Sequence, residues 1–169
     1  MKISIGADHR GVDALDHVAS ELKQQGHQVV LIEQGPDDGQ CDYPDVAYPV
    51  ANAVSLGQAQ RGILICCTGI GMSIAANKIK GIRAALVHDE IGADLSRRHN
   101  DANVLCISAD MLGIRTIHKI INTWLETPFD GGRHQRRIDK ISQIERGLPS
   151  SVYVKKDLGD SLQSGLKKV

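Results

Sequence analysis

The residues best suited to chemistry lie at the end of an apolar run at positions 62–67 and directly after it. Cys66 and Cys67 end this run, and a glycine-rich turn at 68–71 leads into the next helical segment. Backbone N–H groups in such a turn can bind an anion, and the positive end of a following helix lowers the pKa of a nearby thiol. Adjacent residues of a strand point to opposite faces, so only one thiol can face the turn. The pattern favours an oxyanion or phosphate pocket with a cysteine as acid or base, and the plainer alternative is a cysteine buried for packing.

Two other functions for this turn fit less well. A dinucleotide-binding fingerprint needs a third glycine, where this chain has Ile74, and it normally follows the first strand. A phosphatase-like cysteine loop needs an arginine in its anion cradle, but the next basic residue along the chain is Lys78. The sequence around the turn therefore favours the acid–base pocket.

A pair of arginines could hold a phosphate. Arg133 and Arg137 follow a double glycine and are four residues apart, so on a helix both project from one face. Guanidinium groups bind phosphomonoesters through paired hydrogen bonds. A solvated basic face is the alternative for these two residues, and Arg136 and Lys140 fit that description better.

Acid–base groups stand at two further places. His99 ends a predicted helix, where it could exchange a proton near neutral pH or simply contact the last carbonyls, with Asn100 as a left-handed cap. Asp8 and His9 directly follow the first predicted strand, at the edge where α/β proteins bind ligands. Asp8 could equally be the N-cap of the helix that begins near Gly11. Together these signals describe a pocket with a thiol, an imidazole, an anion hole and a phosphate clamp.

The elements that must position these groups alternate along the chain. Strands are expected at 2–6, 28–32, 62–67, 82–87 and 103–107, and helices at 12–25, 44–56, 74–78, 89–99, 113–125 and 134–144. Glycines and prolines indicate a loop at 34–44, and Pro49 is a weak point in the second helix unless it falls in the first turn. This alternation predicts an α/β fold: a three-layer, Rossmann-like, open parallel sheet of about five strands with helices on both faces.

Composition excludes several classes of protein. The 169 residues carry 20 basic and 20 acidic side chains, so no overall field attracts nucleic acid or an anionic membrane, and 3% aromatic residues are too few for base stacking. No apolar run approaches the ~20 residues of a membrane span, and the first ten residues are not those of a signal peptide. The four cysteines form no CxxC pair, which disfavours a zinc site and indicates reduced thiols in the cytoplasm. One domain is expected at 1–147, with a polar C-terminal tail at 148–169 that is partly disordered or a weak docking helix.

The motifs, taken together, resemble those of the type B ribose-5-phosphate isomerases. These enzymes form one sugar-phosphate isomerase family with the galactose-6-phosphate isomerase subunits. The resemblance spans residues 1–147 and rests on GADH at 6–9, DYP at 42–44, ILICCTGIG at 63–71, AANK at 75–78, GIR at 81–83, RHN at 98–100 and GGRHQ at 131–135.

The resemblance implies an aldose–ketose isomerase that interconverts ribose 5-phosphate and ribulose 5-phosphate without metal or cofactor. It assigns Cys66 as the base that moves a proton between C2 and C1, and His99 as the acid that opens the furanose ring. The enediolate would be stabilised by Thr68, Asn100 and the backbone of Cys67, Gly69, Ile70 and Gly71. Contacts with the sugar and its phosphate would come from Asp8, His9, Tyr43, Arg133 and Arg137. Family members are dimers whose pockets borrow residues from the partner chain, so a homodimer or a tetramer is expected.

Three positions depart from the family pattern. Cys67 replaces the glycine common after the base, Asp110 stands where many ribose-type members have an arginine that helps hold the phosphate, and Asp16 replaces a basic residue. An acid repels a phosphate unless it turns away, so Asp110 leaves other substrates open: allose 6-phosphate, galactose 6-phosphate or a four-carbon sugar phosphate. A non-catalytic sugar-phosphate-binding subunit is a further alternative, but such a protein would not need both Cys66 and His99.

Overall fold

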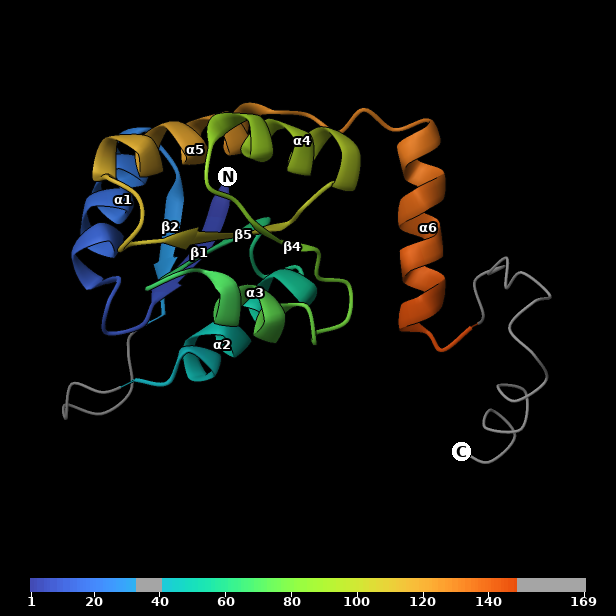
Figure 1. Cartoon of the computed structure of the whole chain (residues 1–169), viewed down its shortest axis with the longest axis horizontal. Helices are drawn as coiled ribbons and strands as arrows, with labels where there is room; N and C mark the ends of the chain where they lie inside the picture. Colours follow the sequence, from blue (N-terminus) through green and yellow to red (C-terminus); the bar gives the residue numbers. More distant parts are fainter. Residues whose placement is uncertain (33–40, 149–169) are drawn as a thin grey trace.

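The computed structural model describes residues 1–32 and 41–148, and in it a five-stranded sheet is covered by helices on both faces (Figure 1). The strands are β1 (Lys2–Ala7), β2 (Gln28–Leu31), β3 (Arg61–Cys66), β4 (Ala84–Leu86) and β5 (Val104–Ser108). The helices are α1 (Val12–Gln24), α2 (Tyr43–Ser55), α3 (Ile70–Ala76), α4 (Glu90–Asn100), α5 (Ile114–Glu126) and α6 (Arg133–Glu145). Most of the loop predicted at 34–44, and all of the predicted tail except Leu148, lie outside the described residues.

All strand pairs are parallel, in the order β2-β1-β3-β5-β4. The predicted three-layer, open parallel α/β sheet is thereby confirmed. Because the chain runs outward from β1 to β2 on one side and places β3 on the other, the direction of winding reverses between β1 and β3. A crevice at such a reversal, outside the carboxyl ends of the strands, is where open α/β sheets bind their ligands.

Both faces of the sheet are apolar, as a buried parallel sheet requires. In β3, Ile63 and Ile65 face α1, α4 and α5, whereas Leu64 and Cys66 face α2 and α3. The first layer is completed by buried residues of those three helices: Leu15, Val18, Leu22, Ala93, Ile117, Ile120 and Trp124. The second is completed by Val46, Ala47, Val50, Ala51, Met72 and Ala76. The alternation of β3 thus directs Cys66 to the α2/α3 side of the sheet.

Two elements differ from the sequence-based expectation. Helix α3 begins at Ile70 rather than at 74, because Gly69 adopts a left-handed conformation (φ 76°) that turns the chain directly from β3 into the helix. Pro49 lies well inside α2, and the helix continues through it. Ala47, Val50 and Ala51 of the same helix are fully buried, so tertiary packing offsets the backbone hydrogen bond that proline cannot donate.

Helix α6 contacts the end of α4 and projects away from the sheet without covering it (Figure 1). Among its residues only His134 and Ile138 are buried, and Ile141 and Ile144 are exposed. Strand β4 is an edge strand whose three residues are all half-buried. Within residues 1–32 and 41–148, no helix combines the length and the apolar character needed to cross a membrane.

Candidate active site

The loops after β1, β3 and β5 lie side by side at the carboxyl edge of the sheet. The N–H of Asp8 donates to Ile65 O (3.2 Å), and the N–H of Ala109 donates to Cys66 O (2.8 Å). Helix α1 leaves this edge toward one face and α3 toward the other. Residues that follow the three strands therefore lie together at the carboxyl edge of the sheet.

Cys66 is the last residue of β3, and its side chain is set against the turn that follows. The thiol is only 4% exposed, and its Sγ accepts a hydrogen bond from the N–H of Gly69 (3.0 Å). A β-carbon at position 69 would lie 2.5 Å from Leu86 Cδ1, so the turn that aims this N–H requires glycine both for its φ and for its close packing. The backbone N–H of Gly69 and the burial of the side chain thus hold the Cys66 sulfur in one place at the end of β3.

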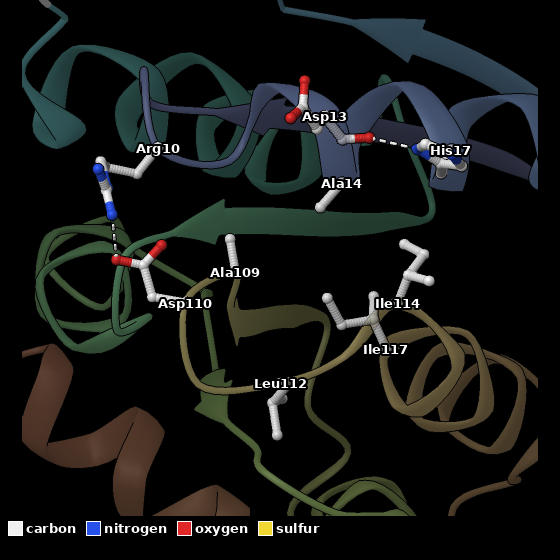
Figure 2. Close-up of a pocket in the computed structure, with 9 residues that line it drawn as sticks. All are labelled: Arg10, Asp13, Ala14, His17, Ala109, Asp110, Leu112, Ile114 and Ile117. Atoms are coloured by element: carbon white, nitrogen blue, oxygen red, sulfur yellow. Dashed lines mark hydrogen bonds and ion pairs between the residues drawn. The ribbon is translucent and has the colours of Figure 1, made fainter.

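Cys67 points to the other side of the sheet and has different partners. It is half-buried, and a hydrogen bond with the Asp110 carboxylate raises the pKa of the Cys67 thiol above its ordinary value. The Arg10 guanidinium pairs with Asp110 (2.8 Å) and lowers the pKa of that carboxyl group (Figure 2). Cys67 therefore stays protonated at neutral pH, and of the two adjacent thiols Cys66 is the better candidate for a base.

The other residues predicted for this edge are also found there. Asp8 is buried, and its Oδ1 accepts from the N–H of Arg10 (2.9 Å), so it stabilises the turn after β1; the N-cap of α1 is Gly11, and the suggested capping role of Asp8 is wrong. His9 is exposed at the same turn. A β-carbon on Gly71 would lie 2.7 Å from the Tyr43 ring, which places this exposed tyrosine beside the turn. The remaining members of the turn are Thr68, whose Oγ1 accepts from the N–H of Ile70 (3.2 Å), and Ile70 itself, which is exposed.

A second cluster forms where α6 meets the end of α4. The rings of His99 and His134 stack with centroids 4.2 Å apart and planes 3° from parallel. His134 is 5% exposed and its Nε2 accepts from Arg133 Nε (3.2 Å). Burial, followed by the positive charges of its neighbours, lowers the pKa of His134. The stacked pair therefore keeps His134 neutral, while half-buried His99 remains open to a ligand on its other face.

Arginines surround this second cluster. Arg133 and Arg137 are both exposed on α6, one helical turn apart, and both lower the pKa of His134. Arg98 pairs with Asp130 (3.2 Å) and lowers the pKa of that carboxyl group. This basic face is suited to an anion such as a phosphomonoester.

Asn100 ends α4 beside these residues and is exposed. The left-handed cap of the helix is Asp101 (φ 44°), so the assignment of that cap to Asn100 is wrong. The carboxylate of Asp101 binds Arg83 and Arg97 at 2.8 Å each, which explains why the acid rather than the amide takes the strained position.

Three potential metal ligands meet in the second cluster, but their geometry suits an anion better. One ligand atom from each of His99, Asp130 and His134 lies within 4.8 Å of the others. The lone pairs of imidazole nitrogens lie in the ring planes, and two parallel stacked rings cannot direct them at one ion. Asp130 is already paired with Arg98, and Arg133 already donates to His134. The donor set therefore does not fit a metal ion in this arrangement.

The two clusters lie at opposite edges of the sheet. The guanidinium groups of Arg97, in the last turn of α4, and of Arg61, the first residue of β3, lie 5.8 and 5.9 Å from the ring centroid of Trp124. The end of α4 is therefore beside the start of β3, whereas Cys66 is five residues further along the strand, about 16 Å away. Within one chain, Cys66 and His99 cannot act on the same atoms.

The sequence did not assign a role in the site to three residues of these clusters: Arg10, Asp130 and His134. Arg10 and Asp110 are 100 positions apart, and only the order of the strands brings them together. His134 follows Arg133 directly and could have been noticed as a titratable group on the predicted basic helix. Nothing in the sequence indicates that it would be buried against His99.

The fold and the two clusters define an α/β protein with a buried thiol at the carboxyl edge of its parallel sheet and an arginine-rich face on a projecting helix. The profile of the Ribose/Galactose Isomerase family matches residues 3–141, and the chain belongs to this family. The resemblance inferred from the motifs is thereby confirmed, and the protein is an aldose–ketose isomerase of sugar phosphates.

Relatives include enzymes named for different sugars. Ribose-5-phosphate isomerase B of Escherichia coli is 42% identical over 146 residues, which cover 86% of this chain and 97% of that protein. D-erythrulose-4-phosphate isomerase of Pectobacterium atrosepticum is 41% identical over 145 residues, covering 86% and 95%. The structure of ribose-5-phosphate isomerase B from Mycoplasma genitalium with bound ribulose-5-phosphate is similar with a TM-score of 0.82 at 43% identity, covering 86% of this chain and 96% of that one.

Proposed function

We propose that this protein interconverts D-ribose 5-phosphate and D-ribulose 5-phosphate by proton transfer through an enediolate, with Cys66 as the base. The observation that carries the proposal is the hydrogen bond from the N–H of Gly69 to Cys66 Sγ (3.0 Å), at the crevice between β1 and β3. This contact fixes the Cys66 sulfur at the edge of the sheet where open α/β folds bind ligands. The raised pKa of Cys67 removes the competing thiol.

The reaction then needs no metal. The Cys66 thiolate takes the proton from C2 of the open-chain aldose, and the electron pair forms the C1–C2 double bond while O1 becomes an oxyanion. Thr68, the backbone of the turn at 67–71 and Asn100 bind the enediolate oxygens, because stabilisation of the developing charge is the main requirement of such a step. Cys66 returns the proton to C1, and the proton of the C2 hydroxyl moves to O1, which gives the ketose. Beforehand, His99 donates a proton to the ring oxygen as its bond to C1 breaks, and the C1 hydroxyl gives its proton to solvent, which opens the furanose to the aldehyde.

This mechanism requires two chains in each site. Since Cys66 and His99 lie at opposite edges of one chain, His99, Asn100, Arg133 and Arg137 act on substrate at the partner's Cys66. The proposed assembly is a homodimer, alone or as half of a tetramer. Its interface is supported by the open edge of β4 and by exposed apolar residues on the surrounding helices: Ile70, Ile74, Ile91, Leu95, Ile141 and Ile144.

Every residue of both clusters lies within 1–147, so this domain is the proposed catalytic unit. A thiolate base needs a reducing compartment, and within the described part of the chain all four cysteines are free, which supports a cytoplasmic location.

A four-carbon sugar phosphate is the second candidate substrate. The relative from Pectobacterium atrosepticum is named for D-erythrulose 4-phosphate, and Asp110 changes the charge near the crevice. The two candidates differ in their need for ring opening. A four-carbon sugar esterified at O4 cannot close a furanose ring, so it does not need the proposed acid His99.

The test is the initial rate of isomerisation of ribose 5-phosphate, erythrulose 4-phosphate, allose 6-phosphate and galactose 6-phosphate, with Cys66→Ala as the inactive control. The proposal predicts the highest kcat/KM with ribose 5-phosphate and a loss of several orders of magnitude in Cys66→Ala. His99→Asn should then cost activity on ribose 5-phosphate but not on erythrulose 4-phosphate. A higher kcat/KM on another sugar would reject the substrate assignment, and full activity of Cys66→Ala would reject the mechanism.

A further inference from the structure

The ion pair between Arg10 and Asp110 joins two loops across the end of β3. Arg10 follows β1 and Asp110 follows β5, and β3 lies between these strands. A hydrogen bond holds the backbone of each loop: Asp8 Oδ1 accepts from the N–H of Arg10 (2.9 Å), and the N–H of Asp110 donates to Cys67 O (3.3 Å). The pair therefore bridges the turns on either side of the strand that carries the proposed base.

Stability gives no reason for this pair. The side chain of Arg10 is 56% exposed and that of Asp110 is 33% exposed. Exposed ion pairs contribute little to folding, because water screens them and the long side chain loses freedom. The contact does, however, fix the guanidinium at one place above the crevice.

The fixed guanidinium still has donors to offer. One of its five N–H groups is donated to Asp110 Oδ2 at 2.8 Å, and the others have no partner among the residues that the structure describes. The Asp110 carboxylate is paired with the Arg10 guanidinium and hydrogen-bonded with Cys67, and both contacts lower its pKa. The expected repulsion between Asp110 and a phosphate is thereby replaced by an arginine that can bind one.

The position of Arg10 separates it from the reacting carbons. Cys66 faces the α2/α3 side of the sheet, whereas Arg10 and Asp110 border a pocket of about 330 Å³ between α1 and α5, on the other side (Figure 2). Asp13, Ala14 and Ala109 also line this pocket. A substrate whose C1 and C2 are at Cys66 would present its distant, charged end to Arg10, and binding of a remote phosphate is a common way to orient a small sugar.

We propose that Arg10 is a substrate-binding residue whose guanidinium contacts the phosphate of the sugar, and that Asp110 is the positioning residue that holds it there. This inference rests on the proposed function, since it assumes that sugar phosphate binds at the Cys66 crevice. It adds a phosphate contact from the chain that supplies the base, opposite the arginines that the partner's α6 would bring.

The test compares Arg10→Ala, Asp110→Asn and the exchanged pair Arg10→Asp/Asp110→Arg, with Lys23→Ala as a control that removes an exposed cation from the far end of α1. Steady-state kinetics on ribose 5-phosphate give KM and kcat, and inorganic phosphate serves as a competitive inhibitor and as the ligand in calorimetry. Arg10→Ala should raise KM and the inhibition constant of phosphate by about ten-fold to a hundred-fold while kcat changes less than about three-fold. Lys23→Ala should match the wild type.

The other two variants separate binding from positioning. Asp110→Asn should raise KM by about two-fold to ten-fold, because the freed arginine must be ordered by the substrate. A lower KM would show that Asp110 only repels phosphate and would overturn its positioning role. The exchanged pair should recover at least part of the affinity lost in Arg10→Ala, and no recovery would argue against a guanidinium contact held at this place.

Calorimetry with inorganic phosphate distinguishes failure of the Arg10 site from failure of the proposed function. If the wild type isomerises no sugar phosphate but binds inorganic phosphate, and Arg10→Ala abolishes that binding, the proposed function fails and the Arg10 site stands. If the enzyme is active and Arg10→Ala leaves KM and phosphate binding unchanged, the Arg10 site is wrong and the proposed function stands. Absence of phosphate binding by the wild type would also overturn the Arg10 site.

Discussion

Two inactive variants should restore each other's activity when their subunits are exchanged. In the proposed dimer each site takes Cys66 from one chain and His99 from the other. A heterodimer of Cys66→Ala and His99→Asn chains therefore has one site with both substitutions and one site with neither. Each parent homodimer, by contrast, carries the same defect in both sites.

The expected recovery follows from counting sites. Free exchange between equal amounts of the two variants makes about half of all dimers heterodimers, and half of the sites in these are intact, so activity should rise to about one quarter of the wild-type value. Cys66 lies about 16 Å along β3 from the edge where α4 ends, whereas proton transfer needs heavy atoms about 3 Å apart. A site within one chain cannot use both groups.

The assay mixes the purified variants, exchanges subunits by brief dilution from mild denaturant, and measures isomerisation of ribose 5-phosphate. The matched control mixes Cys66→Ala with the double variant Cys66→Ala/His99→Asn, in which no combination of subunits creates an intact site. Recovery near one quarter in the first mixture alone supports the shared site. If mixing restores nothing although mass spectrometry detects heterodimers, the shared site is refuted.

Three further perturbations test local features of the site. Gly69→Ala should lower the free energy of unfolding, measured in urea, by about 1–2 kcal/mol, because φ is 76°, and should also reduce kcat as the N–H leaves Cys66; an unchanged kcat would contradict the role of that hydrogen bond. Since Asp110 raises the pKa of Cys67 above 9.0, alkylation of Cys67 followed by mass spectrometry should have its midpoint above pH 9.0, and Asp110→Asn should lower it; an unmoved midpoint would reject the contact. Burial lowers the pKa of His134 below 6.5, so the unfolded state takes up the proton first and the stability of the fold should decrease as pH drops through 6.5. The melting temperature of His134→Gln should decrease less than that of the wild type over this range. If the two curves of melting temperature against pH are parallel, His134 is not the group responsible.

The fold class was predictable because it depends on local patterns that repeat. Each strand is an apolar run and each covering helix has one apolar face, so the alternation alone indicates a layered α/β sheet. The start of α3 was misplaced because the conformation of Gly69 depends on packing against Leu86 and Ile107, which a sequence does not display. The path of α2 through Pro49 was likewise decided by buried neighbours rather than by local preference.

The parts of the candidate site that depend on one strand and the residues just after it were predictable from the sequence. Cys66 ends a strand, and Thr68 and Asp8 come within two residues of a strand end, so their place at the carboxyl edge depends only on parallel topology. The link between Arg10 and Asp110 depends on the order of the strands, and the stacking of His99 on His134 depends on where α6 meets α4. Such long-range contacts leave no periodic signal, so reasoning from residue type alone did not find them.

The most direct test of the central claim follows hydrogen exchange rather than net turnover. The protein is incubated with ribose 5-phosphate in D₂O, and NMR monitors deuterium at C2 of the aldose and at C1 of the ketose. The account predicts that label enters in the wild type and in Cys67→Ala but not in Cys66→Ala, because Cys66 alone carries the proton through the enediolate. Incorporation by Cys66→Ala at the wild-type rate, or its loss in Cys67→Ala alone, would contradict the assignment of the base.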